Sequence, residues 1–354
     1  MAELPVRQFR KILLIKPSSL GDCIHALPVL NALNKSLPEA EIFWLINSEY
    51  ADLLTNHPGL AGLILFRRSL FRPRQLGYPT LAETWRLWRR LRAERFDLAI
   101  DLQGLFRSAV MSLASGARHR LGLPDAREFA GLFYTHRVRS DPSDVHAVDR
   151  YLRSLESFGI SQGEPDFSLP VDSTGLSEVQ QMLSARGLDE RKEFVLVVPG
   201  ARWQSKRWPI ERFAAVIDGI RTELSLPSVL AGSAGEVELC RELAGLCHSR
   251  PLNLAGRTSL AQLMALISTC RLVLGHDSGT IHLAHALARP LVCLVGPTDP
   301  SKTGPYGRID SVVRAGVPCA PCRRTVCPDN RCMTLISPAE VLARVEAILS
   351  PGAS

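Results

Sequence analysis

The segment HDSGTIHLAHAL, residues 276–287, places a carboxylate, a hydroxyl and a glycine where an apolar run gives way to helical spacing. Asp277 and Ser278 should therefore stand at a helix N-terminus, where the first backbone N–H groups lack partners and the peptide dipoles leave partial positive charge. Such a terminus binds phosphate or carboxylate, and Gly279 lets an anion approach the backbone closely. Because Asp and Ser also cap helices of every kind, an ordinary N-cap is the alternative.

A lysine in a second strand-to-helix loop could supply positive charge for binding the same kind of anion. Lys206 lies in PGARWQSKRWP, residues 199–209, after an apolar run and ahead of a helix that begins at Pro209. A cation here would meet phosphate oxygens where a helix N-terminus also points. A solvated surface lysine is the alternative, but the flanking Trp203 and Trp208 favour a ligand-binding loop.

Two acidic residues occupy similar loops. Asp22 follows the first apolar run and the small residues Ser18, Ser19 and Gly21, and its carboxylate could act as a general base on a substrate hydroxyl. Glu236, in AGSAGEVE, could accept hydrogen bonds from ribose hydroxyls. In both cases the alternative is stabilisation of the helix that follows.

The 354-residue chain has a formal net charge of +7 at pH 7, which favours anionic partners. Basic residues gather in FRRSLFRPR (66–74), WRLWRRLRAER (85–95) and GARHR (116–120). A solvated helix face explains the second run best, whereas the others could face a substrate. Guanidinium groups suit carboxylates and phosphates, so the candidates for binding an anionic acceptor are Arg67, Arg68, Arg118 and Arg120.

Four of the nine cysteines cluster in CAPCRRTVCPDNRC. Thiolates at this spacing could close a tetrahedral structural zinc site and so pin an irregular loop. The intervals are short and the second pair is not C-x-x-C, so four reduced thiols without metal are the alternative. The candidate ligands are Cys319, Cys322, Cys327 and Cys332.

Apolar runs alternate with helical stretches in two series, separated by a linker near residues 161–173. Near-continuous apolar strands with intervening helices indicate parallel sheets that are covered on both faces. The first series predicts strands over 11–16, 41–46, 62–66 and 97–102 and helices over 23–37, 81–95, 105–114 and 147–158. The second predicts strands over 193–200, 227–232, 271–275 and 290–296 and helices over 209–224, 235–247, 260–269, 280–288 and 338–349.

This alternation predicts an α/β protein with two Rossmann-like, doubly wound domains that face each other across a cleft and bind ligands at the carboxyl ends of their strands. We expect an N-terminal domain over residues 1–170, a C-terminal domain over 171–336, and a final helix and tail over 337–354. No signal peptide and no apolar run of membrane-spanning length is visible, so we expect a cytoplasmic protein whose basic runs touch the inner membrane.

The chain contains neither G-x-G nor G-x-x-x-x-G-K-[ST], so it lacks the usual dinucleotide-binding and P-loop fingerprints. A basic nucleic-acid-binding protein with a zinc knuckle is an alternative of another class, although the sequence shows no recognised nucleic-acid-binding module. A binding subunit that keeps the fold without catalysis is a third hypothesis.

Four separated motifs resemble the family 9 glycosyltransferases, the ADP-heptose:lipopolysaccharide heptosyltransferases: ILLIKPSSLGDCIHALPVLNAL, the loop with Lys206 before RWP, DSGTIHLAHAL, and VGPTDPSKTGPYG. The resemblance covers nearly the whole chain in the right order. Within the family, AREFAGLFYTHRV and HAVDRYL are most similar to heptosyltransferase I. The resemblance implies a GT-B fold, with the acceptor in the N-terminal domain, the ADP-sugar in the C-terminal domain, and inversion without a catalytic metal.

The resemblance also implies roles for individual residues. Asp22 matches the family's proposed base, while Lys206 and the N–H groups of residues 278–280 would stabilise the departing diphosphate. The family often has hydroxyl residues where this chain has Ala201 and Arg202. The expected donor-binding residues are Ser18, Ser19, Gly21, Arg202, Lys206, Glu236, Asp277, Ser278, Gly279, Thr280 and His282.

The implied reaction transfers heptose from ADP-heptose to the lipopolysaccharide inner core, with Kdo-lipid A or heptosyl-Kdo as the acceptor. Another nucleotide sugar or acceptor within the same family is the alternative. The expected partners are the ADP-sugar, the lipopolysaccharide acceptor and the cytoplasmic face of the inner membrane, and no nucleic acid. No cofactor is required for catalysis.

Overall fold

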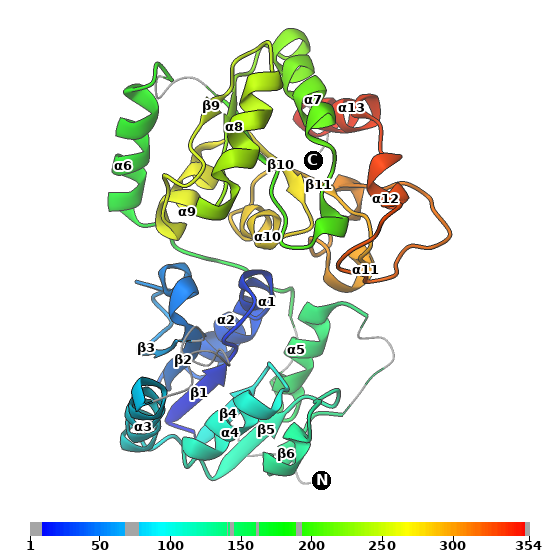
Figure 1. Ribbon diagram of the computed structural model, residues 1–354. Helices are drawn as coiled ribbons and strands as arrows, with labels where there is room; N and C mark the ends of the chain where they lie inside the picture. Colours follow the sequence, from blue (N-terminus) through cyan, green and yellow to red (C-terminus); the bar gives the residue numbers. More distant parts are fainter. Residues whose placement is uncertain are drawn as a thin grey trace. The chain divides into compact units, whose positions relative to one another are not determined.

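The computed structural model describes residues 9–67, 78–139, 141, 145–160, 163–188 and 193–350. The chain divides into two compact units, Met1–Pro170 and Val171–Ser354, and each is built around one six-stranded sheet with helices on its faces (Figure 1). Every strand pairing in both sheets is parallel. The two parallel α/β sheets predicted from the alternation of strands and helices are therefore confirmed.

The sheet of the first unit has the strand order β3-β2-β1-β4-β5-β6. Its strands are β1 (Lys11–Ile15), β2 (Glu41–Asn47), β3 (Gly62–Phe66), β4 (Leu98–Asp101), β5 (His119–Gly122) and β6 (His136–Arg137). Its helices are α1 (Leu20–His25), α2 (Leu27–Ser36), α3 (Tyr78–Ala93), α4 (Phe106–Ala114) and α5 (Ala147–Glu156), with 3₁₀ turns η2 (Ser48–Leu53) and η5 (Ala130–Phe133).

The sheet of the second unit has the order β12-β11-β10-β7-β8-β9. Its strands are β7 (Val195–Val198), β8 (Ser228–Leu230), β9 (Leu252–Asn253), β10 (Leu272–His276), β11 (Leu291–Leu294) and β12 (Val312–Val313). Its helices are α6 (Ser173–Ser184), α7 (Ile210–Glu223), α8 (Val237–Leu246), α9 (Leu260–Thr269), α10 (Gly279–Ala286), α11 (Pro300–Thr303), α12 (Arg331–Thr334) and α13 (Pro338–Leu349), with 3₁₀ turns η6 (Gln204–Lys206), η7 (Ala234–Glu236) and η8 (Ile309–Ser311).

Both sheets have the same winding, because each unit's strands run 3-2-1-4-5-6 when they are counted from the unit's own first strand. The winding reverses between the first and the fourth strand, which are β1 and β4 in one unit and β7 and β10 in the other. In open α/β sheets, ligands bind outside the carboxyl ends of the strands at this reversal. The loops that follow these four strands are therefore the places to look for a site.

The apolar strands are buried as their sequences require. Residues 12–15 of β1 and all of β7 lie in the core, and α7 and α13 pack over β7, β10 and β11. Two core tryptophans satisfy their indole N–H groups: Trp44 Nε1 donates to Lys16 O at 3.2 Å, and Trp208 Nε1 to Ile336 O at 3.1 Å. None of the helices in the described ranges is long and apolar enough to cross a membrane.

The structure differs from the sequence-based elements in three places. The helix predicted over 23–37 is split at Ala26 into α1 and α2, because Pro28 enters the first turn of α2 and has no N–H to continue the hydrogen-bond ladder. Helix α6 begins where the linker was expected to end. Strands β5, β6, β9 and β12 were not predicted, because they are short and include partly exposed positions instead of a continuous buried apolar run.

Candidate active site

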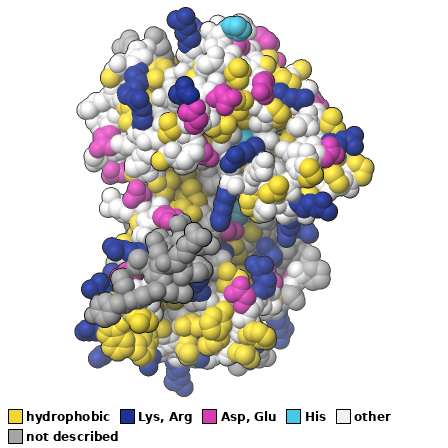
Figure 2. Space-filling view, in the orientation of Figure 1, with side chains coloured by type: hydrophobic (Ala, Val, Ile, Leu, Met, Phe, Trp, Pro, Cys, Tyr) yellow, Lys and Arg dark blue, Asp and Glu magenta, His cyan; other side chains and the backbone are white. Residues whose placement is uncertain are grey.

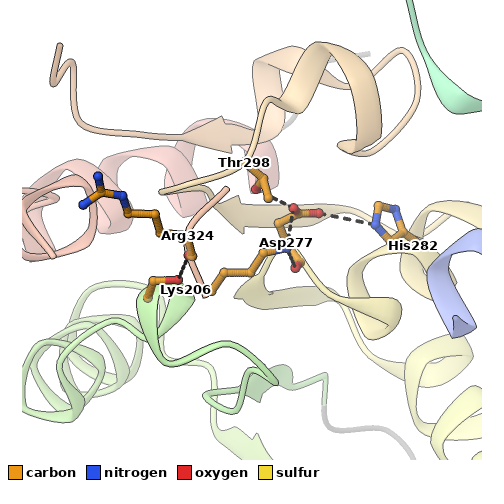
Figure 3. Close-up of polar contacts among 6 residues, drawn as sticks. Lys206, Asp277, His282, Thr298 and Arg324 are labelled. Carbon is orange, nitrogen blue, oxygen red and sulfur yellow. Dashed lines mark hydrogen bonds and ion pairs between the residues drawn. The ribbon is translucent and has the colours of Figure 1, made fainter. Parts of the chain in front are cut away.

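The centre of the candidate site in the second unit is an ion pair. The loop after β7 turns through η6 and carries Lys206, whose Nζ donates to Asp277 Oδ2 and to Asp277 O, both at 2.8 Å (Figure 3). Asp277 directly follows β10, the strand next to β7. The pair thus lies at the reversal point of the sheet.

The Asp277 carboxylate is held from all sides. Its Oδ2 also accepts from Thr298 Oγ1 at 2.7 Å, and its Oδ1 lies 3.4 Å from His282 Nε2. Burial opposes ionisation of Asp277, but the hydrogen bond from His282 and the charge of Lys206 outweigh it, so the pKa of Asp277 lies well below its usual range. Asp277 is therefore an anion that fixes the lysine.

The Lys206 ammonium keeps one donor for a ligand. An ammonium has three N–H donors, and Asp277 takes two of them. The side chain is 16% exposed and its Nζ lies 5.0 Å from the centre of the Trp203 ring, which limits the directions in which the third N–H can point. The arrangement presents an oriented positive charge.

Backbone donors lie beside this charge at the start of α10. Ser278 is the N-cap with an extended backbone, and its hydroxyl makes no capping bond. Within the described parts of the chain, the N–H groups of Ser278, Gly279 and Thr280 meet no protein acceptor. Free amides and the helix dipole together make this an anion-binding terminus.

His276 joins the lysine loop to β10. Its ring is fully buried, its Nε2 accepts from the Trp208 N–H at 2.9 Å, and the ring packs edge-on against Phe213. Burial lowers the pKa of His276 to about 4. The neutral ring therefore positions the segment that carries Lys206.

The segment that contains the four clustered cysteines, residues 319–332, is hydrogen-bonded to the loop that carries Lys206. Ser205 N donates to Thr325 O at 3.2 Å and Ser205 Oγ to Arg324 O at 2.5 Å (Figure 3), and Asn330 Nδ2 donates to Arg207 O at 3.2 Å. Both residues that flank Lys206 are thus tied to the segment, which therefore stabilises the position of the lysine.

The four clustered cysteines do not form a closed metal site. Cys319 and Cys322 are exposed, Cys327 is half-buried and Cys332 is buried. Burial and the nearby thiols of the other three raise the pKa of Cys332, so the four sulfurs lie within electrostatic range of one another. No three His, Cys, Asp or Glu side chains of the described residues are placed to hold a metal ion.

Glu236 uses one carboxylate oxygen for its own loop. Its Oε2 accepts from Ser233 N at 2.7 Å and Ser233 Oγ at 2.8 Å, which closes a capping box. Its Oε1 reaches the end of β7, where a Cβ added to Gly200 would lie 1.9 Å from it. The predicted helix-stabilising role is present, and Oε1 makes no hydrogen bond with the described residues. In the same region Arg202 is exposed.

Asp22 in the first unit, like Glu236, uses one carboxylate oxygen to cap a helix. Helix α1 begins at Leu20, three residues earlier than predicted, so Asp22 lies in its first turn. Asp22 Oδ2 accepts from Ser19 N at 2.9 Å and Ser19 Oγ at 2.7 Å, while Oδ1 bonds to nothing in the described part of the chain. Asp22 caps α1 and still offers an oxygen to a substrate proton. Gly21 is buried in the same turn.

A pocket of about 240 Å³ opens at the carboxyl ends of the strands in the first unit. It begins at Pro17 and Ser18, beside the Asp22 loop, and its wall includes Gln103 after β4 and Arg107 in the first turn of α4. The Arg107 guanidinium lies 5.9 Å from the Phe66 ring centre. This pocket occupies the β1/β4 reversal point, where a ligand is expected.

Asp101 shapes the Gln103 loop. Its Oδ1 accepts from the N–H groups of Gln103 (2.8 Å) and Gly104 (3.1 Å), and its Oδ2 accepts from Tyr134 Oη at 2.7 Å. Burial raises the pKa of Asp101 in spite of these bonds. Gln103 Oε1 itself is buried and has no hydrogen-bond partner among the described residues.

The arginines proposed for the acceptor are not brought together. Arg67 follows β3 at the carboxyl edge, 3.9 Å from Glu83, and Arg68 lies outside the described residues. Arg118 precedes β5, at the opposite edge of the sheet. The Arg120 guanidinium donates to Phe133 O and Ala117 O within the fold.

Sequence reasoning missed Thr298, Gln103 and Arg107. Thr298 belongs to VGPTDPSKTGPYG, a motif noted only for its family resemblance. Gln103 and Arg107 lie in DLQGLFRSA, directly after a predicted strand, and that position was the available signal.

Because His276 is neutral in the folded protein, the free energy of unfolding should depend on pH. An unfolded histidine titrates near 6.5, so between pH 6.5 and about 4 the unfolded chain takes up a proton that the folded chain does not. The free energy of unfolding should fall as the pH is lowered through this window, by up to about 1.4 kcal/mol per pH unit. His276→Asn keeps an acceptor for the Trp208 N–H but cannot titrate, so urea unfolding should show a shallower slope than wild type. Equal slopes would contradict the assignment.

Comparison with known proteins places this chain in a family. Residues 84–332 match the profile of glycosyltransferase family 9 (heptosyltransferase). Lipopolysaccharide heptosyltransferase 1 of Pseudomonas aeruginosa is 31% identical over 96% of this chain and 98% of its own length. Lipopolysaccharide core heptosyltransferase OpsX of Haemophilus influenzae is 29% identical over 86% and 84%.

A solved structure agrees with this placement. The structure of E. coli ADP-heptose lps heptosyltransferase II matches with a TM-score of 0.78 at 26% identity, over 96% of this chain and 98% of that one. The predicted GT-B fold class is thereby confirmed, and so is the prediction that the chain is a glycosyltransferase. The chain belongs to glycosyltransferase family 9, the heptosyltransferase family.

Proposed function

We propose that this chain is an inverting glycosyltransferase that transfers a heptose from ADP-heptose to the lipopolysaccharide inner core, with Kdo-lipid A or heptosyl-Kdo as the acceptor. The observation that carries the proposal is the Lys206–Asp277 pair beside the free amides of α10, in a chain whose relatives bear the name heptosyltransferase. The name of the E. coli structural relative includes ADP-heptose, which supports this donor.

The donor diphosphate is proposed to bind at Lys206 and the N-terminus of α10. The third N–H of Lys206 and the amides of Ser278, Gly279 and Thr280 supply donors that need no rearrangement. Asp277 and His282 act through the lysine, since their polar atoms are used in holding it. Glu236 Oε1 is available for a ribose hydroxyl and the exposed Arg202 for a phosphate.

In the proposed step, Asp22 Oδ1 takes the proton of an acceptor hydroxyl as that oxygen bonds to the anomeric carbon. The bond from this carbon to the ADP oxygen breaks on the opposite face, and the electron pair leaves with the diphosphate. Charge therefore grows where the Lys206 ammonium and the α10 amides would stabilise it. These groups supply the positive charge for which other enzymes use a divalent ion.

The acceptor is proposed to enter the pocket of the first unit. Arg107 on its wall supplies a guanidinium for a carboxylate or phosphate, and Gln103 Oε1 needs a donor such as a sugar hydroxyl. The pocket adjoins the Asp22 loop through Pro17 and Ser18, so a sugar held there would present a hydroxyl near the base. Of the arginines expected from the sequence, Arg67 lies at the same edge of the sheet.

Two further assignments stay separate proposals. The first is attachment to the cytoplasmic face of the inner membrane, which an acceptor anchored in lipid and the net charge of +7 both favour. The second is that Cys319, Cys322, Cys327 and Cys332 are reduced thiols without a resident zinc, since no three of these described side chains are placed to hold a metal ion; elemental analysis of the purified protein tests this directly.

Removal of Lys206 should weaken donor binding. Lys206→Ala deletes a charge-assisted hydrogen bond, so the Kd for ADP should rise by about 10- to 100-fold in titration calorimetry. Lys302→Ala, an exposed lysine on α11, is the matched control and should bind ADP like wild type. An unchanged Kd for Lys206→Ala would exclude the lysine from the donor site.

Removal of the Asp22 charge should stop transfer without affecting the donor. With ADP-heptose and Kdo-lipid A in the presence of a chelator, wild type should form ADP and a heptosylated product detectable by mass spectrometry. Asp22→Asn should lower kcat by about 100-fold or more at an unchanged Kd for ADP. Glu340 receives the same two bonds from Ser337 as Asp22 does from Ser19, so Glu340→Gln controls for loss of a capping charge. Turnover by Asp22→Asn at the wild-type rate would remove Asp22 from the mechanism.

Substitution of Arg107 and of Arg118 tests at which end of the first unit's strands the acceptor binds. Arg107→Ala should raise the KM for the acceptor by about tenfold and leave the KM for ADP-heptose unchanged, because the anionic group of the acceptor loses a partner and the donor does not. Arg118→Ala, at the amino edge, should change the acceptor KM little. The reverse pattern would place the acceptor away from the pocket.

A further inference from the structure

Two neighbouring helices of the first unit expose apolar side chains to water with the same spacing. The exposed positions are i, i+4 and i+7 on each helix, which places them on one face. Helix α3 packs against α4, so the two rows belong to one surface. On α3 the exposed residues are Leu81, Trp85 and Trp88, and on α4 they are Phe106, Val110 and Leu113.

The turn η5 extends this surface. It packs against α4, and Phe129, its N-cap, and Leu132, within it, are 82% and 78% exposed. We call the exposed apolar residues of α3, α4 and η5 the apolar face. Figure 2 shows hydrophobic side chains gathered over α3 and α4. Large exposed side chains concentrated in this way mark an interaction surface.

On α3 the apolar face is bordered by positive charge. Arg86, Arg89 and Arg92 are exposed on α3 beside its apolar row, and the Arg92 guanidinium lies over Gly116 at the end of α4. Glu83 is the one acidic residue in α3, and it lies 3.7 Å from Arg86. Tryptophan and arginine together are typical of segments that lie in the headgroup region of an anionic bilayer.

We infer that the apolar face docks on the surface of a bilayer that contains anionic lipids. Charge decides against a second copy of the chain, because a two-fold symmetric contact would bring the arginines of α3 close to their own copies. The location fits the substrate: Arg107, Ser108 and Met111 of α4 line the proposed acceptor pocket, so the docked helix would hold that pocket next to the lipid. The inference rests on the proposed function only for this last point.

Vesicle co-sedimentation of the full chain tests the inference without any enzyme assay. Wild type should sediment with vesicles of phosphatidylethanolamine and phosphatidylglycerol, and less with phosphatidylcholine alone or at high salt. Trp85→Ser/Trp88→Ser should weaken binding to the anionic vesicles by about tenfold. Val237→Ser/Leu246→Ser removes two exposed apolar residues from α8 of the other unit and should bind like wild type.

Two kinds of result would overturn the inference. One is equal vesicle binding by wild type and Trp85→Ser/Trp88→Ser at matched thermal stability. The other is a change from dimer to monomer in the Trp variant on gel filtration while vesicle binding stays unchanged, which would assign the face to a second copy. In transfer assays, the Trp variant should keep wild-type kcat/KM on a soluble acceptor without acyl chains. If wild type also fails to transfer heptose to the soluble acceptor, the proposed function is contradicted, whereas the vesicle-binding result still supports docking.

Discussion

The Asp277 carboxylate is the constraint on which the second unit's site depends. A buried ion pair gains little by itself, because desolvation of both charges offsets their attraction. Here Thr298 and His282 satisfy the remaining acceptor positions, so the pair becomes part of a hydrogen-bonded network. Lys206, Asp277 and Thr298 follow β7, β10 and β11, so one carboxylate fixes three adjacent loops.

In the first unit, Asp101 holds the loop that follows β4. Asp101 ends β4 and gathers the backbone of Gln103 and Gly104 and the hydroxyl of Tyr134. Lys16, which follows β1, donates from its buried Nζ to Leu102 O at 2.9 Å and so ties the two strands of the reversal point together. A buried polar residue thus stands at the reversal point of each sheet, and in each case it shapes loops more directly than it could touch a substrate.

Sequence patterns predicted the strands and helices, which depend on neighbouring residues, and missed side-chain contacts between residues far apart in the chain. Apolar runs located eight of the strands, because burial on both faces leaves a continuous signal. The sequence could not decide whether Asp22 caps a helix or acts as a base, or whether Glu236 caps a helix or binds ribose, since the choice depends on which carboxylate oxygen the neighbouring serine occupies. The partners of Asp277 lie up to 71 residues away, beyond any spacing rule. Arg118 and Arg67 look alike in sequence, yet they stand at opposite edges of one sheet.

The contact between Gly200 and Glu236 has an evolutionary consequence. The carboxylate of Glu236 fills the volume that a β-carbon at position 200 would need, so a larger residue at 200 requires the Glu236 side chain to move or to be shorter. A methyl group at 200 would displace this carboxylate unless the side chain at 236 were shorter, and with a shorter side chain the two substitutions together should cost less than the sum of each made separately. Among homologues, a side chain at position 200 should therefore accompany a shorter residue at 236, so the glycine here reflects the size of its neighbour as well as the shape of its own backbone.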